Sequence, residues 1–185
     1  MRPFAHFLTI ARHRRLVRKY CFRLGLFRQG LTHDLSKYAP AEFFVGARYF
    51  RGDDSPNFTE RRENGLGYSE AWLRHKGRNK HHVDYWLDYC LQPDGSFAFQ
   101  SCRMPLPYVA EMFCDRLAAN QVYHGKNYTD AMPYEYFART KDKLPIHPDT
   151  CAEIEKMLLI LRDEGADTAF DYIKKRLNDE KRSAR

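Results

Sequence analysis

The chain has 185 residues, which is the usual length of one domain and is enough to bury a hydrophobic core. Hydrophobic residues make up 43% and aromatic residues 15% of the sequence, so a largely disordered chain is excluded. The net charge is +7, and residues 1–51 hold 11 Lys and Arg against 2 Asp and Glu, so the positive excess is local and suits either phosphate-bearing partners or a solvated basic face.

The sequence carries no signal for secretion or for a membrane span. No apolar run approaches the roughly 18 residues that a membrane helix needs, and the N-terminus lacks the apolar segment and cleavage site of a secretory signal. The five cysteines are scattered and never in CxxC spacing, which argues against a disulfide framework or a cysteine zinc site. We therefore expect a cytoplasmic protein with reduced thiols and no membrane partner.

Helical spacing of apolar residues begins near the N-terminus. It predicts a helix over residues 4–24, with Gly25 as its stop. The short segment 31–37 leads to Pro40, which suits the first turn of a helix that runs through Phe50. Further helices are predicted, in chain order, over residues 53–64, 68–90, 108–122, 133–139, 148–162 and 167–177.

Few features interrupt this helical pattern. Gly77 weakens the middle of the helix predicted over residues 68–90. Residues 92–107, rich in Pro, Gly and Ser, are predicted to form the one substantial loop, and Gly165 separates the last two helices. No strand-like alternation exceeds four residues and no internal repeat is present, so we predict an all-α fold.

The sharpest local signal is the segment Thr32-His33-Asp34-Leu35-Ser36-Lys37. Adjacent side chains on a regular helix diverge by about 100°, so His33 and Asp34 reach one ion only from a distorted turn or a helix start. Imidazole and carboxylate together are the ligands that Mn, Fe, Zn, Co and Ni prefer. One turn of helix after this point places Lys37 on the side of His33.

The order His13, then His33-Asp34, then Asp115 resembles the HD-domain superfamily of metal-dependent phosphohydrolases, with Ser36 where that family usually has Gly. The resemblance covers about residues 8–120. It implies an orthogonal helical bundle in which His13, His33, Asp34 and Asp115 hold a divalent metal. The chain also resembles small bacterial proteins of uncharacterised function that share the Thr-His-Asp-Leu-Ser-Lys and His-Lys-Gly-Arg-Asn-Lys-His-His segments.

The domain organisation expected from this resemblance is simple. A single HD-like helical domain would span residues 1–178. Within it, the metal-site core would occupy about residues 8–120 and the C-terminal helices residues 132–178. The charged residues 179–185 would form a frayed tail.

A second cluster of histidines and cations lies in residues 74–82. On a helix, His75 and His82 would share one face. Two-metal members of the superfamily add histidines between the His-Asp pair and the final Asp, and His75, His81 and His82 resemble these in order, with tighter spacing. Alternatively, His75 or His82, together with Lys37, serves catalysis. The cations proposed to bind substrate phosphate are Arg74, Arg78 and Lys80.

Other candidate residues have simpler explanations. His6 is an alternative to His13 as the first ligand, although it lies beside Phe4 and Phe7. Glu111, one helical turn before Asp115, is more simply a surface or salt-bridging residue than part of the site.

Three functions are compatible with the sequence. The first is a phosphohydrolase that uses one or two divalent transition-metal ions on a phosphoester or nucleotide-like small molecule. The second is a di-iron oxygenase on the same helical scaffold. The third is a non-enzymatic module whose basic first helix binds nucleic acid or an acidic partner, which the sequence favours less because its intervening apolar residues suit a buried stripe.

Overall fold

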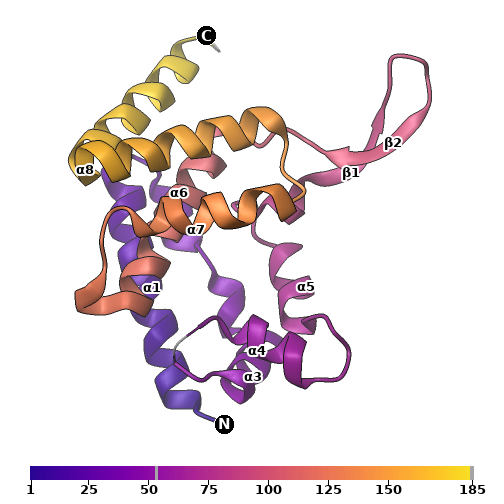
Figure 1. Ribbon diagram of the computed structural model, residues 1–185, viewed down its shortest axis with the longest axis vertical. Coiled ribbons are helices and arrows are strands. Elements are labelled where there is room, and N and C mark those ends of the chain that lie inside the picture. The colour runs from indigo at the N-terminus through magenta and orange to yellow at the C-terminus, as the bar shows by residue number, and fades with distance from the viewer. Residues whose placement is uncertain (53, 184–185) are drawn as a thin grey trace.

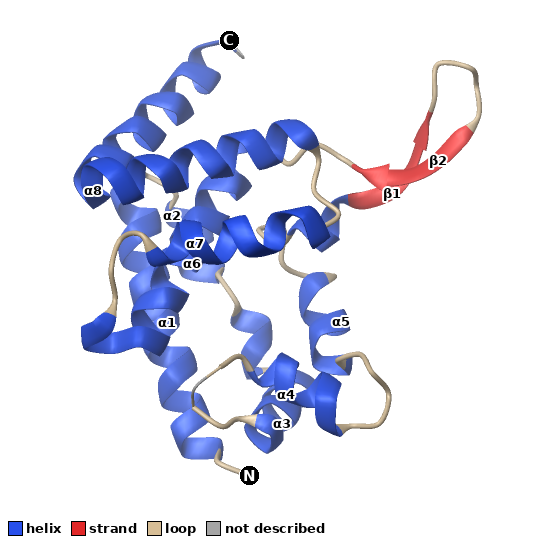
Figure 2. Ribbon diagram, viewed as in Figure 1, coloured by secondary structure: helices blue, strands red, loops and turns tan. Residues whose placement is uncertain are grey.

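The computed structural model describes residues 1–52 and 54–183. Its elements, in chain order, are α1 (Pro3–Arg23), α2 (Phe27–Thr32), the 3-10 helix η1 (Leu35–Tyr38), α3 (Pro40–Tyr49), α4 (Pro56–Glu63), α5 (Glu70–Lys76), η2 (Val83–Trp86), β1 (Leu87–Leu91), β2 (Phe97–Ser101), α6 (Leu106–His124), η3 (Gly125–Asn127), α7 (Met132–Thr140), η4 (Lys141–Lys143) and α8 (Pro148–Ser183). Helices dominate the chain, which confirms the predicted all-α class (Figure 2).

Prolines fix where several helices begin. Pro3, Pro40, Pro56 and Pro148 are the first residues of α1, α3, α4 and α8. Proline is favoured there because its fixed φ suits a helix and the first turn has no intrahelical partner for its missing N–H. Pro40 is therefore a local cause of the break between α2 and α3, in which the His-Asp pair lies.

Helix α6 is the centre of the core and packs between α1 and α8. Its residues are apolar on most sides, as a helix surrounded by other helices requires. Phe113 is fully buried and meets Phe170 of α8 edge to face, with 5.7 Å between ring centroids. On the α1 side, the Tyr20 hydroxyl donates to Gln121 of α6. The core thus fixes α1 against α6, the two helices that carry His13 and Asp115.

The helix predicted over residues 68–90 is wrong beyond its first third. Helix α5 ends at Lys76, Gly77 caps it, and the Asn79 side-chain amide donates to the backbone oxygen of His75. This side-chain bond satisfies a carbonyl at the end of α5, while Gly77 itself keeps a right-handed conformation with φ −70°. The following residues turn through η2 into strand β1.

Strands β1 and β2 form an antiparallel hairpin that the sequence analysis missed (Figure 1). The predicted helix over residues 68–90 covers all but the last residue of β1, and the predicted loop over residues 92–107 covers β2. The connecting turn contains Gly95, at φ 84°, and closes with a bond from the Gln92 N–H to the Ser96 oxygen. Aromatic residues on both strands and a glycine in the five-residue turn are the features that favour this hairpin.

Helix α8 bends at Gly165, whose φ of 84° is not helical, in keeping with the predicted separation of two helices. It then continues to Ser183, past the predicted helix end at 177, whereas residues 184 and 185 of the predicted frayed tail lie outside the described residues. Among the helices that the structure describes, none is both long and apolar enough to cross a membrane.

Candidate metal centre

The predicted break at the His-Asp pair is present and is sharp. Helix α2 ends at Thr32, η1 begins at Leu35, and Asp34 between them adopts the left-handed conformation with φ 51°. It is the only residue other than glycine with a positive φ in the described part of the chain. Such strain persists where the surroundings impose it, and here it turns two consecutive side chains into one space.

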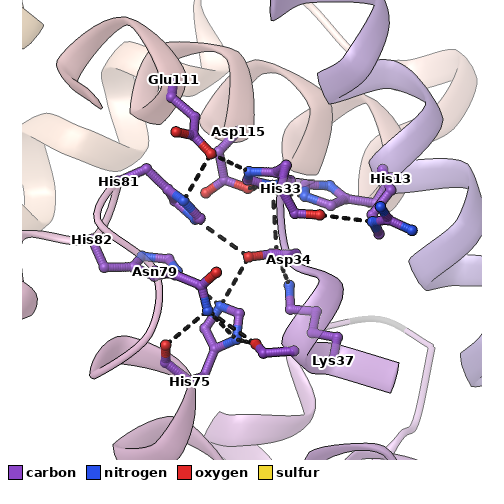
Figure 3. A network of polar contacts seen from close by, with 12 residues as sticks. His13, His33, Asp34, Lys37, His75, Asn79, His81, His82, Glu111 and Asp115 are labelled. Carbon is purple, nitrogen blue, oxygen red and sulfur yellow. Dashed lines mark hydrogen bonds and ion pairs between the residues drawn. The ribbon is translucent and has the colours of Figure 1, made fainter. Parts of the chain in front are cut away.

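Four parts of the fold converge on Asp34 (Figure 3). Helix α1 supplies His13, and α6 supplies Asp115. Helix α5 supplies His75, and the turn after it supplies His81 and His82. Asp34, His33, His75 and His81 are each no more than 3% exposed, so the cluster is built into the interior.

The first group of possible ligands is the predicted set His13, His33, Asp34 and Asp115, whose ligand atoms all lie within 4.8 Å of one another. His33 Nε2 is 3.5 Å from Asp34 Oδ2 and 3.4 Å from Asp115 Oδ1, while His13 Nε2 is 2.9 Å from the same Asp115 oxygen. Ligands held about 2.1 Å from one metal stand about 3.0 to 3.4 Å apart, in octahedral or tetrahedral geometry.

The second group is Asp34, His75, His81 and His82, and it shares Asp34 with the first. Asp34 Oδ1 lies 3.2 Å from His75 Nε2 and 3.4 Å from His81 Nε2. His75 Nε2 is 2.9 Å from His82 Nε2. The sequence analysis placed His75 and His82 together on one helical face, and the structure instead brings them together across the turn that follows α5.

Two glutamates orient these imidazoles. Glu111 Oε1 lies 2.9 Å from His33 Nδ1 and 3.2 Å from His81 Nδ1. Glu42 Oε2 lies 3.0 Å from His75 Nδ1. If each Nδ1 carries the proton that its glutamate accepts, each Nε2 presents a lone pair toward Asp34. Carboxylates bound in this way to the far nitrogen are the usual support of metal-binding histidines.

The inner atoms of the cluster lie in ion-pair contacts but make no well-aligned hydrogen bonds. Among the described residues, the buried atoms without a hydrogen bond include His13 Nε2, His33 Nε2, His81 Nε2 and both carboxylate oxygens of Asp34, although Lys37 Nζ lies 2.7 Å from Asp34 Oδ2. Buried polar atoms are rarely left so in proteins unless an ion or water satisfies them. All five belong to residues of the two ligand groups, so these buried His and Asp groups are able to hold a metal ion.

The electrostatics of the cluster are those of a strongly coupled network. Burial alone lowers the pKa of His33, but Asp34, Asp115 and Glu111 outweigh burial and raise that pKa to about 10. Burial also opposes ionisation of Asp34, yet the charges of His33 and Lys37 hold its pKa well below the usual range. A metal ion would take the place of the His33 proton in neutralising these carboxylates.

The predicted cations are not all near the centre. Lys37 Nζ lies 2.7 Å from Asp34 Oδ2, and Arg78 lies 3.5 Å from Glu42 Oε1. Arg74 instead donates to the backbone oxygen of Ala41, and Lys80 lies over the rings of Tyr85 and Tyr108. The structure therefore brings Lys37 and Arg78 to the network and directs Arg74 and Lys80 elsewhere.

Three placements differ from the simplest reading of the sequence. Glu111 is 5% exposed and contacts two histidines, so the expected surface role is wrong. Glu42 was not identified, because a single Glu at the start of a helix forms no motif. Its hydrogen-bond donor Ser36 does belong to the motif of residues 32–37. His6 packs between Phe43 and Phe50 and belongs to neither ligand group, which leaves His13 as the histidine of α1 at this site.

Comparison with known proteins gives a family without an assigned activity. No curated protein and no solved structure matches the chain. A family model described as "Family of unknown function (DUF5662)" matches residues 2–160, a span that contains every residue of both ligand groups. The chain therefore belongs to the DUF5662 family.

Proposed function

We propose that the protein is a metal-dependent phosphohydrolase that acts on a phosphoester or nucleotide-like small molecule. The observation that carries this proposal is the pair of buried His and Asp groups that share Asp34. His13, His33, Asp34 and Asp115 would hold the first ion. Asp34, His75, His81 and His82 would hold the second, and His-rich sets of this kind favour Mn, Fe, Zn, Co or Ni over Ca or Mg.

The charge of the site supports an anionic substrate once metal is bound. The network contains the carboxylates of Asp34, Glu42, Glu111 and Asp115. Two cationic side chains, Lys37 and Arg78, offset two of these four negative charges. With neutral histidines, one divalent ion balances this excess of two negative charges, and a second makes the site positive.

Hydrolysis needs an activated water and stabilisation of charge on the phosphoryl oxygens. A bound divalent ion supplies Lewis acidity and lowers the pKa of water. Lys37 stays protonated at neutral pH, because the Asp34 charge outweighs the effect of burial and raises its pKa. Its side chain is 33% exposed, so it would act as a fixed positive charge toward substrate and not as a proton donor.

His75 and His82 have two alternative roles that the metal count separates. Burial, together with the charges of His81 and His75, holds the pKa of His82 well below its usual range, so the ring is neutral. With one ion per chain, bound by the first group, His75 and His82 would keep their contact through Nε2 and would serve proton transfer or phosphate binding. With two ions, both are ligands.

The test compares metal content and phosphate release in the wild type and in Asp34→Asn. Asn tolerates the left-handed conformation at this position, so the variant removes the charge with little backbone strain. Asp171→Asn, at an exposed position of α8, is the control. We expect one or two equivalents of transition metal and metal-dependent release of phosphate from nitrophenyl phosphate or a nucleotide panel, both lost only in Asp34→Asn.

Two results would reject this function. Metal that is fully retained in Asp34→Asn would remove the proposed site. Iron-loaded protein that develops oxo-iron absorbance in air and releases no phosphate would favour the di-iron oxygenase instead.

A second candidate function, binding of nucleic acid by α1, rests on its outward face. Arg12, Arg15, Arg18 and Lys19 line a surface hollow of about 490 Å³ with Phe22, and within the described residues none of the four forms an ion pair. Unpaired cations beside an exposed aromatic ring suit a single strand of nucleic acid. Binding of an oligonucleotide should weaken steeply with salt. Changing these four residues to Gln should abolish it, whereas Lys174→Gln/Lys175→Gln on α8 should not.

A further inference from the structure

The β1–β2 hairpin projects from the helical body and presents an unusual surface (Figures 1 and 2). The register pairs Tyr89 with Phe99 and Leu91 with Phe97. These four side chains therefore lie on one face of the hairpin, and they are 60–69% exposed. Asp88 belongs to the opposite face, because side chains alternate along a strand.

A two-stranded hairpin of this kind is marginally stable in water unless something covers its apolar face. The two aromatic rings of the Tyr89–Phe99 pair already contact each other, with 5.2 Å between their centroids, but their outer surfaces remain open to solvent. Exposed apolar patches of this composition mark interaction sites in soluble proteins.

We propose that the covering partner is a second copy of this chain, whose hairpin packs face to face against the first about a twofold axis. Such an interface needs a surface that complements itself, and an apolar face without charged side chains does so because the same residues meet on both sides. Two sheets packed in this way stand about 10 Å apart, with the side chains of their inner faces between them.

The area of the face, if fully covered, is just large enough for a specific dimer. Each aromatic side chain buries about 150–250 Å² when fully covered. The exposed fractions of Tyr89, Leu91, Phe97 and Phe99 then give about 500 Å² per copy, or about 1,000 Å² for both, which reaches the lower bound for a specific interface.

The distribution of charge also selects a second copy over a charged partner. Residues 87–101 contain no Lys or Arg, so the hairpin offers nothing to the phosphates of a nucleic acid or to an acidic protein. Its carboxylates, Asp88 and Asp94, lie on the opposite face and in the turn, so no like charges meet in the interface. The projecting hairpins also separate the two bodies, each of which carries the net positive charge of the chain.

Sedimentation velocity of the full chain over a wide range of concentration tests the proposal. We expect the wild type to approach twice the 22.0 kDa of one chain. Phe97→Thr/Phe99→Thr should remain at the mass of one chain, because Thr keeps the strand propensity and removes the apolar face. Gln100→Thr, on the opposite face of β2, is the matched control and should still dimerise.

Hydrogen exchange identifies the surface independently of mass. In the wild type, the backbone amides of residues 87–101 should become more protected as concentration rises, and in the double variant they should not. The circular dichroism of the helices should be the same in all three proteins. A wild type that stays monomeric throughout would overturn the proposal. A dimer that persists in Phe97→Thr/Phe99→Thr, or that protects a different segment, would do the same.

Discussion

His33 divides its two ring nitrogens between different tasks, and this division explains how a buried cluster stays in position. Nδ1 meets Glu111 at 2.9 Å, and Nε2 points toward Asp34 and Asp115. The same glutamate contacts His81. A single carboxylate on α6 therefore sets the ring orientation of a histidine in each of the two ligand groups, so its removal should affect both.

Glu111→Gln should weaken metal binding by about 10- to 100-fold, because an amide is a poorer acceptor than a carboxylate for the two imidazole N–H groups. The metal dissociation constant, measured by competition with a coloured chelator, checks this value. Glu135→Gln on α7 is exposed and should leave the constant unchanged. Equal affinity in Glu111→Gln and the wild type would show that Glu111 does not support the ligands.

His6 should make the stability of the protein sensitive to acid. Burial, with a smaller contribution from the charge of Lys37, lowers the pKa of His6 from 6.5 to about 4. The unfolded chain therefore binds a proton on this ring between pH 6.5 and 4 while the folded chain does not. The stability that neutral His6 contributes is fully present above pH 6.5 and is lost as the pH falls through this window. The loss is at most about 3 kcal/mol, because solvent screens the partly buried ring.

Urea unfolding at a series of pH values measures this loss. The difference in unfolding free energy between the wild type and His6→Asn isolates His6, because the other titrating groups are common to both proteins. We expect the difference to narrow or reverse in favour of His6→Asn as the pH falls from 7 to 4. Parallel pH profiles would contradict the assignment.

At the scale of elements, Gly165 and Gly77 differ in whether the backbone conformation at their position needs a glycine. Gly165, inside α8, has φ 84°, a region that side chains rarely occupy, although a Cβ there would meet nothing within 4 Å. Gly77, at the end of α5, has φ −70°, and a Cβ would lie 3.5 Å from the Leu73 oxygen in ordinary contact. The bend of α8 therefore depends on glycine, whereas the end of α5 does not.

Gly165→Ala should lower the free energy of unfolding by about 1–3 kcal/mol, the cost of holding an L-residue at φ 84° and ψ 173°, a region that is essentially confined to glycine. Gly77→Ala should be neutral or stabilise by up to about 1 kcal/mol, because alanine loses less chain entropy on folding. Urea denaturation of both variants provides the comparison. A greater loss for Gly77→Ala than for Gly165→Ala would contradict this account of the two helices.

At the scale of the whole molecule, local signals predicted more than long-range ones did. Proline and helical periodicity predicted the all-α class, and the His33-Asp34 pair required a broken helix, which the structure contains. The hairpin was missed because the helical pattern of residues 68–90 was continued through Gly77 over the start of β1, although local features favour the Tyr89–Phe99 pairing. Glu42 was missed because its contact with His75 spans 33 residues.

The proposed metal should stabilise the entire fold, because its ligands join α1, the turn at His33-Asp34, the turn after α5 and α6. A ligand at 100 times its dissociation constant adds about 2.7 kcal/mol to the free energy of unfolding. For a chain of this length, that corresponds to an increase in Tm of about 5–10 °C.

Thermal melts of chelator-treated protein with and without Mn, Fe or Zn measure the change. Ca should have a much smaller effect, because it disfavours imidazole ligands. The increase should vanish in Asp34→Asn, and the same Tm with and without transition metal in the wild type would mean that this cluster holds the helices together through its own ion pairs alone.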